Sequence, residues 1–285
     1  PDLSVLKLIE ESELKRGPEI GSGAFGTVYK GIWSPVGKRI KVAVAIKVLN
    51  EGSSTSLQNE LLDEARVMSS VTHPCCIKIL AVCMARTMML ITPLVNNGSL
   101  LEYIRKNKAD SSTLLKWATQ IARGMNYLEQ KGIVHRDLAA RNILVHNKSQ
   151  VKITDFGLAK LLNCEEYYLA TGGKMPIKWI ALESIEHRVF THKSDVWSYG
   201  VTLWELFTSG DRPYDNIKAI DMAQYLENGN RLSQPPICTI DVYMLMVKCW
   251  LVHAESRPSF AELETEFSIM SRDPGRYLVI EVRKN

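Results

Sequence analysis

Residues 133–145, IVHRDLAARNILV, place a group of polar and charged side chains between two short apolar runs. A solvent-exposed loop would account for such a segment without any function. Asp137 and Asn142, however, lie five residues apart and offer a carboxylate and a carboxamide. Their oxygen atoms suit a base that accepts a hydroxyl proton, or the binding of a hard cation. The remainder of the chain has to decide between the two interpretations.

Length, composition and charge are typical of a soluble globular protein. The chain has 285 residues, of which 46% are hydrophobic and 23% charged. Its 35 basic and 31 acidic residues give a net charge of +4, which is too even for a nucleic-acid-binding surface. No apolar run reaches the ~18 residues that span a bilayer, and no signal peptide opens the sequence. We therefore expect no nucleic-acid partner, and contact with a membrane only through segments outside this chain.

The cysteines predict a reducing compartment. None of them forms a C-x-x-C pair, so a zinc ribbon is not expected. Most lie among apolar neighbours, as in PCCIKILAVC and MVKCW, which indicates buried reduced thiols and fits the cytosol. The set comprises Cys75, Cys76, Cys83, Cys164, Cys238 and Cys249.

The chain divides into two unlike parts. Residues 14–93 predict mostly strands, such as GTVYKGIW and KVAVAIKVL, with a single helix in SLQNELLDEARVMSS. Residues from 99 onward predict mostly helices, including LLKWATQIARGMNYLEQKG, which ends at Gly132, and the apolar DVWSYGVTLWELFTSG. The turn-rich PLVNNGS lies between them and predicts a hinge. We expect an α+β fold of two lobes, with a small ligand bound in a cleft between them.

A glycine-rich motif lies near the start of the strand-rich part of the chain. GSGAFGTVYKG spaces Gly21, Gly23 and Gly26 as G-x-G-x-x-G, and Val28 follows two residues later. Glycine allows the backbone to approach a phosphate closely, although a hairpin without a ligand is the alternative. A dinucleotide-binding turn would need a helix to begin at the third glycine, and the strand-like TVYKGIW argues against one. The Walker motif is absent.

Two further motifs complete a series. Lys47 lies in the apolar strand VAVAIKVL, where a charge needs a partner or a ligand. Glu64, 17 residues later on the single helix, is the candidate partner, and its neighbour Asp63 is the competing one. TDFG then supplies Asp155, 13 residues after Asn142. The order of glycine loop, strand lysine, helix glutamate, H-R-D-x-x-x-x-N and D-F-G predicts phosphoryl-transfer chemistry.

In this order the motifs resemble those of a protein kinase over nearly the whole chain, and of a tyrosine kinase in particular. HRDLAARN has Ala139 where serine/threonine kinases typically carry a lysine, and Arg141 where tyrosine kinases place an arginine. KMPIKWIALES resembles the segment that docks a substrate tyrosine, with Pro176 against the ring. ALE at residues 181–183, TDFGLAKLL and THKSDVWSYGVTLWEL are similar to the epidermal growth factor receptor subfamily.

The resemblance implies a bilobal α+β protein-kinase fold and an active receptor protein-tyrosine kinase. Such an enzyme transfers the γ-phosphate of Mg-ATP to tyrosine hydroxyls of protein substrates, on the cytoplasmic side of the plasma membrane as part of a single-pass receptor. The implied single domain, residues 1–285, consists of a juxtamembrane remnant (1–13), an N-lobe (14–93), a hinge (94–98) and a C-lobe (99–285). Ser99 stands where several members of the subfamily have a cysteine.

The resemblance also implies roles for individual residues. Asp137 would accept or orient the substrate hydroxyl and Arg141 would support it. Lys47, held by Glu64, would bind the α- and β-phosphates. Mg²⁺ would be held by Asn142 and Asp155. The nucleotide would further contact Gly21, Gly23, Gly26, Val28, Ala45, Thr92, Pro93, Val95 and Leu144; for the apolar ones, packing in the core is the alternative.

Further implied contacts are structural. Asp195 would brace the catalytic loop, and Glu183 and Arg257 would form an ion pair. Arg136 would pair with the activation segment, NCEEYYLATGG at residues 163–173. His135 is expected to be structural rather than catalytic.

A last implication concerns activation by a second copy. Ile240, Met244 and Val247 lie at i, i+4 and i+7 of a predicted helix, and packing in the core is the alternative for this face. In the subfamily this face activates a second kinase in an asymmetric homo- or heterodimer. The receiving residues here would be Leu6, Leu8 and Leu62.

Two other functions compete with an active kinase. A pseudokinase scaffold is compatible with the same fold, but the lysine, the glutamate and the three residues of the loop motifs are all present. A dinucleotide-binding oxidoreductase is the more distant alternative. Whether Tyr167 or Tyr168 is modified stays open at this point.

Overall fold

The structure, a computed structural model, describes residues 6–22 and 26–280. The chain forms two compact units, Pro1–Asn96 and Asn97–Asn285, hereafter the first and second unit. Gly23 of the predicted glycine loop lies outside the described residues.

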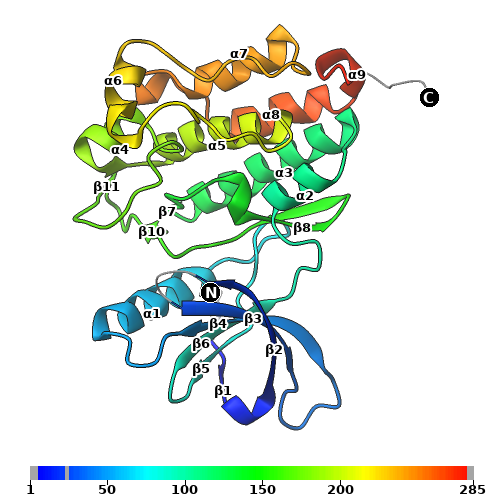
Figure 1. The fold of residues 1–285 in the computed structure, drawn as a ribbon, viewed down its shortest axis with the longest axis vertical. Helices are drawn as coiled ribbons and strands as arrows, with labels where there is room; N and C mark the ends of the chain where they lie inside the picture. The colour runs from blue at the N-terminus through cyan, green and yellow to red at the C-terminus, as the bar shows by residue number, and fades with distance from the viewer. Residues whose placement is uncertain (1–5, 23–25, 281–285) are drawn as a thin grey trace. The chain divides into compact units, whose positions relative to one another are not determined.

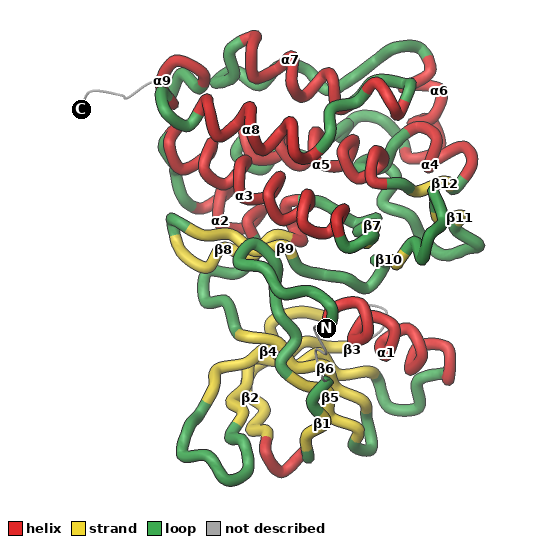
Figure 2. The backbone as a smooth tube through the Cα atoms, turned by 180° about the vertical axis from the view of Figure 1, so that it is seen from behind, coloured by secondary structure: helices red, strands yellow, loops and turns green. Residues whose placement is uncertain are grey.

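The first unit is built on one six-stranded sheet with the order β1-β5-β6-β4-β3-β2 (Figures 1 and 2). Neighbouring strands are antiparallel, except for the parallel pair β1–β5. A short 3₁₀ helix, Glu11–Glu13, precedes β2. The strands are β1 (Leu8–Ile9), β2 (Leu14–Ser22), β3 (Gly26–Trp33), β4 (Val42–Leu49), β5 (Ala81–Met84) and β6 (Met88–Pro93).

Successive residues of a strand point to opposite faces of this sheet, so their burial shows which face each occupies. Val44, Ile46 and Val48 of β4 are buried in the core of the unit. Ala45 and Lys47 therefore lie on the other face, because successive side chains of a strand point to opposite sides. Val28 is directly opposite Lys47 in the β3–β4 ladder and shares that face.

One helix accompanies the sheet. Helix α1 (Thr55–Ser69) begins after Ser54, whose hydroxyl accepts the Leu57 N–H at 3.3 Å and caps the first turn. Its apolar face and Glu64 are buried, while Asp63 is exposed. The helix predicted in this segment is thus confirmed.

Strand β5 is short and begins only at Ala81. The ladder aligns Ala81 with Ile91 of β6, and the Leu80 N–H donates to the Ile91 carbonyl at 2.9 Å. Continuing this register would bring residue 79 opposite Pro93, which has no N–H to donate. The pairing ends there.

The second unit is mainly helical (Figures 1 and 2). Short strand pairs β8–β9, β7–β10 and β11–β12 complete it. The helices are α2 (Leu100–Lys106), α3 (Ser111–Gln130), α4 (Leu182–His187), α5 (His192–Phe207), α6 (Met222–Glu227), α7 (Ile240–Cys249), α8 (Phe260–Met270) and α9 (Pro274–Tyr277). The strands are β7 (Ile133–Val134), β8 (Ile143–Asn147), β9 (Gln150–Ile153), β10 (Lys160–Leu161), β11 (Tyr168–Leu169) and β12 (Val189–Phe190).

Helix α5 is the centre of this unit, and it is buried from Ser194 to Phe207 as its uniformly apolar sequence predicts. Helix α3 packs against α8 and β9, and Gly132 beyond its end has a φ of +71°, a conformation that glycine adopts without strain. Five of the six cysteines are buried and all six are free thiols, as predicted; Cys164 is exposed. The predicted α+β class is confirmed. Within the described residues, no helix is long and apolar enough to cross a bilayer.

Candidate active site

The first unit contains a buried ion pair between β4 and α1. Lys47 Nζ lies 2.7 Å from Glu64 Oε2, and the two side chains are 16% and 7% exposed. A lysine on an apolar strand needs a counter-charge, and α1 supplies Glu64 from its buried face. The competing partner, Asp63, lies on the exposed face.

The other predicted nucleotide contacts of this unit follow from the same sheet. Val28, Ala45 and Thr92 occupy facing or adjacent positions of β3, β4 and β6 and are half-buried. Pro93, the last residue of β6, is opposite Val44. Val95 lies two residues beyond β6, in the predicted hinge, and is also half-buried.

Gly21 and Gly26, the two glycines of the loop that the structure describes, are needed for different reasons. At Gly26 a Cβ atom would collide with the Val48 carbonyl group, so close strand packing demands glycine. At Gly21 a Cβ would meet nothing within 4 Å. Packing therefore does not explain Gly21, and close approach of a ligand to the backbone remains its predicted reason.

In the second unit the segment after β7 forms a tight catalytic-loop candidate that ends in the 3₁₀ helix Ala140–Asn142. Arg141 Nη2 donates to Asp137 Oδ1 at 2.7 Å. Asn142 Nδ2 donates to the Asp137 carbonyl oxygen at 2.7 Å. The chain thus folds back so that the residues at both ends of D-x-x-x-x-N contact each other.

His135 is a buried structural residue, as the sequence predicts. Its Nδ1 accepts the Asp137 N–H at 3.1 Å, which requires the ring proton on Nε2. Nε2 then donates to the Thr154 carbonyl at 2.9 Å. The ring, which is fully buried beside Phe156, holds the start of the catalytic loop against the segment that carries Asp155.

Two carboxylates of α5 hold the backbone of this loop. Asp195 accepts the N–H groups of His135 at 2.8 Å and Arg136 at 3.0 Å, as predicted. Glu205 accepts the Ala140 N–H at 2.9 Å. Burial raises the pKa of Asp195 to about 6, opposed by His135 and by the two N–H donors, and burial also raises the pKa of Glu205.

Glu205 and Trp179 were not predicted from the sequence. Glu205 also accepts the Trp179 indole N–H at 3.0 Å, and the Trp179 ring lies 4.5 Å from the Arg141 guanidinium carbon. The indole therefore links α5 to the residue that binds Asp137. A signal was present, because Glu205 is an acidic residue within an apolar helix, where a carboxylate needs hydrogen-bond donors.

The surroundings of Asp137 act on its protonation in two directions. Its side chain is 16% exposed, and burial raises its pKa because a charged carboxylate loses hydration. The positive charge of Arg141 opposes this increase, while the negative charge of Asp155 adds to it. Arg141 thus favours the ionised form, which is the form that can accept a proton.

The β8–β9 ladder brings Asn142 and Asp155 to the same end of a hairpin. Ile143 pairs with Ile153, and the Thr154 N–H donates to the Asn142 carbonyl at 2.9 Å. Asn142 directly precedes this ladder, and Asp155 lies two residues beyond Ile153, the last residue of β9. Asp155 has a φ of +58°, a left-handed conformation that aspartate tolerates better than most residues, and its Oδ1 accepts the Gly157 N–H at 3.3 Å.

These two side chains fit a magnesium ion by their chemistry. Because the Asn142 NH₂ group is engaged by Asp137, its oxygen is the atom that can bind a cation. Asp155 adds a carboxylate, and Mg²⁺ commonly takes one or two such protein ligands, with phosphate oxygens and water completing six positions. No group of three or more His, Cys, Asp or Glu residues suited to a metal occurs in the described part of the chain.

Leu144, the remaining predicted nucleotide contact, is half-buried on β8 and forms a bridge with Ser99. Ser99 caps α2, since its hydroxyl accepts the Glu102 N–H at 3.2 Å. A serine at this position therefore has a structural function of its own.

Arg136 contacts the activation segment, as predicted. Its Nη1 donates to the Leu158 carbonyl at 3.1 Å, and its guanidinium carbon lies 4.6 Å from the centre of the Tyr168 ring and 4.4 Å from that of Phe190. Tyr168 belongs to β11, which pairs with β12. Tyr168 is therefore held in place, whereas Tyr167 is 52% exposed.

The predicted Glu183–Arg257 pair is also formed. Arg257 Nη1 and Nη2 donate to Glu183 Oε1 and Oε2 at 2.7 and 2.8 Å, which is a two-point contact. The Arg257 side chain is fully buried and also donates to the Leu251 and Lys193 carbonyls. The pair joins α4 to the segment before α8.

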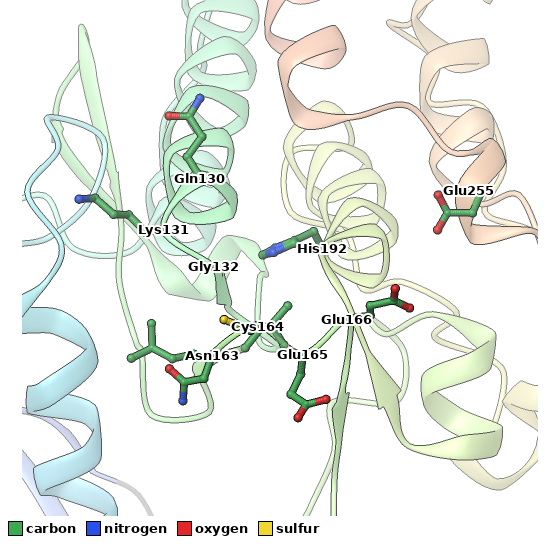
Figure 3. A pocket seen from close by; sticks show the side chains of 11 residues that line it. Gln130, Lys131, Gly132, Asn163, Cys164, Glu165, Glu166, His192 and Glu255 are labelled. Atoms are coloured by element: carbon green, nitrogen blue, oxygen red, sulfur yellow. The ribbon is translucent and has the colours of Figure 1, made fainter.

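A cavity of about 870 Å³ lies elsewhere in the second unit (Figure 3). It is lined by the end of α3, by residues 161–166, and by His192 and Glu255. His192 and Cys164 point into it in the close view, and burial lowers the pKa of His192. None of the predicted catalytic residues lines this cavity.

A sequence model of the protein tyrosine and serine/threonine kinase family matches residues 14–267. The chain belongs to this family. Kinases of this family use ATP and a divalent metal ion. The predicted protein-kinase fold is confirmed by the match.

The predicted resemblance to epidermal growth factor receptors is likewise confirmed. This kinase is 59% identical to the "Epidermal growth factor receptor" of Apis mellifera and 57% identical to the "Receptor tyrosine-protein kinase erbB-4" of Homo sapiens. It is 55% identical to the "Receptor tyrosine-protein kinase erbB-2" of Mus musculus. Each similarity covers 99% of this chain but only 22 to 23% of the relative.

Proposed function

We propose that this kinase transfers the γ-phosphate of Mg-ATP to tyrosine hydroxyls of protein substrates. The observation that carries the proposal is the 2.7 Å contact between Arg141 and Asp137, in a loop whose Asn142 contacts the same aspartate. A pseudokinase scaffold would not need this constellation, nor a lysine paired with a helix glutamate.

Asp137 acts on the substrate hydroxyl. A tyrosine hydroxyl has a pKa of ~10, so it arrives protonated and needs an acceptor within hydrogen-bond reach. Asp137 orients the hydroxyl and takes its proton as the new bond to the γ-phosphorus forms and the bond from that phosphorus to the bridging oxygen of the departing ADP breaks. Arg141 keeps Asp137 ionised, and Trp179 beneath its guanidinium limits the movement of Arg141.

Several charged and polar residues act on the phosphates of the nucleotide. Lys47, oriented by Glu64, binds the α- and β-phosphate oxygens. Asn142 and Asp155 would hold a divalent cation, which would supply positive charge to offset that of the phosphates. The nucleotide base contacts Val28, Ala45, Thr92 and Leu144, while the Pro93 carbonyl accepts a hydrogen bond and the Val95 N–H donates one. The Pro93 role needs only an acceptor, which proline retains.

Specificity for tyrosine follows from the residues around Asp137. Ala139 is small and fully buried, and it takes the place of a charged lysine. Arg141 contacts Asp137, and Pro176 is half-buried in the segment that leads to Trp179. A flat aromatic substrate side chain fits this arrangement better than the short side chain of serine.

The test is a phosphate-transfer assay with Mg-ATP on poly-Glu-Tyr and on matched tyrosine and serine peptides. We expect transfer to tyrosine only, and a loss of activity of at least about a hundredfold in Asp137→Asn, since that is the typical value of a positioned base. Nucleotide binding by Asp137→Asn, measured by titration, should persist. A wild-type chain that binds ATP and transfers nothing is a pseudokinase; preference for NAD over ATP would identify the oxidoreductase alternative.

We further propose that a second copy activates this kinase in an asymmetric dimer. Ile240 and Met244 on α7 are 58% and 45% exposed and Val247 is half-buried, so this face does not belong to the core. On the receiving side Leu8 is 65% exposed, and Leu6 and Leu62 are half-buried. Exposed aliphatic residues on both surfaces support a contact between copies.

Mixing two variants tests the asymmetry. Val247→Arg should abolish activation on vesicles when alone, and so should Leu62→Arg. A mixture of the two should recover activity, because each supplies the surface that the other lacks. Ile220→Arg, at an 88% exposed position outside both surfaces, is the control and should activate normally. Activity of Val247→Arg equal to the wild type would refute the dimer.

We infer from the names of the relatives that this kinase works on the cytoplasmic side of the plasma membrane as part of a receptor. Support comes from the match of the chain to less than a quarter of each receptor. Locating the full-length protein in membrane fractions, with protease protection of the kinase portion in sealed vesicles, tests this.

A further inference from the structure

A long segment of the first unit contains basic residues but no acidic ones. Residues 20–50 contain no aspartate or glutamate and five basic residues. Lys47 is paired with Glu64. The other basic residues are exposed: Lys30, Lys38, Arg39 and Lys41. Three of these four lie in residues 34–41, the connection between β3 and β4.

This connection is a fixed, projecting turn. The Lys38 N–H donates to the Pro35 carbonyl at 3.1 Å, and Gly37 has a φ of +74°, as the third residue of a type II turn requires. The base of the turn is held by Glu13, whose Oε2 accepts the Val36 N–H and the Trp33 indole N–H, each at 3.2 Å. The turn therefore presents its side chains in a defined arrangement.

Aliphatic side chains are exposed among these charges. Val36 near the tip is 77% exposed and Ile40 is 52% exposed. Single exposed aliphatic residues are common, but two within one turn form a small apolar tip. Their neighbours Lys38, Arg39 and Lys41 surround the tip with positive charge.

The adjacent sheet face continues the same surface. Lys15 of β2, Ile32 of β3 and Ala43 of β4 are directly opposite one another in the ladders, and all three are exposed. Lys30 lies two residues before Ile32 and thus on the same face. We name the turn residues 34–41 together with Lys15, Lys30 and Ile32 the basic tip.

We propose that the basic tip docks on an anionic lipid surface, with Val36 and Ile40 in the headgroup region and the lysines and Arg39 against lipid phosphates and carboxylates. An acidic protein would complement the charge but would leave the apolar tip in water. Basic residues flanking exposed aliphatic ones are the composition that binds anionic bilayers, through charge together with shallow burial of apolar area. The proposal departs from the sequence-based expectation that only segments outside this chain contact a membrane, and it does not depend on phosphoryl transfer.

Co-sedimentation of the kinase with vesicles tests the proposal without nucleotide. We expect binding to vesicles of phosphatidylcholine with phosphatidylserine, little binding to phosphatidylcholine alone, and weaker binding at higher salt. Each basic residue at such a surface contributes roughly fivefold in affinity, so Lys38→Gln with Arg39→Gln should lose roughly thirtyfold. Val36→Ser with Ile40→Ser should weaken binding while leaving its salt dependence unchanged.

A charge-matched control keeps the test specific. Lys106→Gln with Lys108→Gln removes the same charge from exposed positions of the second unit and should bind anionic vesicles as the wild type does. Unchanged unfolding of each variant shows that the fold is intact. Equal binding to neutral vesicles, or an equal loss in the control, would overturn the proposal. Retention on immobilised poly-glutamate without binding to vesicles would also overturn it, and would indicate an acidic protein partner.

Discussion

Arg141 Nη2 and Asp137 Oδ1 lie 2.7 Å apart, with both residues on the same short loop and both side chains only partly exposed. The contact opposes the effect of burial, which raises the pKa of Asp137. The ionisation of Asp137, the proposed base, therefore depends more on Arg141 than on any other charged residue.

Replacing Arg141 should shift the pH dependence of the reaction. In Arg141→Gln the opposing charge is lost, so the pKa of Asp137 rises further, and the ionised base is lost at a higher pH as the solution is acidified. The acid limb of the profile of kcat/KM against pH should move upward. Arg123→Gln, which breaks an exposed pair with Glu264, should leave the limb in place. A limb that stays or moves to lower pH in Arg141→Gln would contradict this account.

Removing the charge of Glu64 should weaken the use of ATP. Glu64→Gln keeps the shape of the side chain but leaves Lys47 without its carboxylate, so that the amine is no longer held toward the phosphates. A hydrogen bond to a charged group contributes about 1.5–3 kcal/mol, which predicts a decrease in kcat/KM for ATP of roughly ten- to a hundredfold. Asp63→Asn alters the adjacent exposed carboxylate and should have little effect. Equal losses in the two variants would show that the pair has no special function.

The Glu183–Arg257 pair should matter for stability rather than for catalysis. Glu183→Gln leaves the fully buried Arg257 charge without its partner, and breaking such a pair costs about 3 kcal/mol. Glu264→Gln breaks the exposed pair with Arg123, whose loss should cost less than about 1 kcal/mol. The free energy of unfolding from urea titration measures both. If both variants lowered the free energy of unfolding by a similar, small amount, burial would not explain the stability of the Glu183–Arg257 pair.

The structure also predicts the order in which two adjacent tyrosines are modified. Tyr167 is 52% exposed, while the ring of Tyr168 lies against Arg136 within the β11–β12 pair. A kinase needs its target tyrosine extended into its own site, so Tyr167 should gain phosphate first. Mass spectrometry of peptides at early times, with Tyr167→Phe and Tyr168→Phe compared, measures the order. Phosphate appearing first on Tyr168 would be the contrary result.

Local sequence was sufficient for much of the fold and for the motif residues. A carboxylate on the nearby helix could be expected beside Lys47 because a charge on an apolar strand requires a partner. The choice of Glu64 over Asp63 came from the structure, in which only Glu64 lies on the buried face of α1. The strand and helix periods, and the helix end at Gly132, depend on neighbours along the chain. Asp137, Asn142 and Asp155 could be selected because their spacing matches a known order of motifs.

Other features depend on contacts between distant segments, which residue order does not reveal. Glu205 lies 65 residues from Ala140 in the sequence, and only the folded structure brings its carboxylate to the Ala140 N–H, where it holds the catalytic loop. The exposure of Ile240 and Met244 could not be separated from core packing by helical period, since both give the same spacing. The effect of burial and of Arg141 on Asp137 likewise arises from folding, because desolvation and charge act through space and not along the chain.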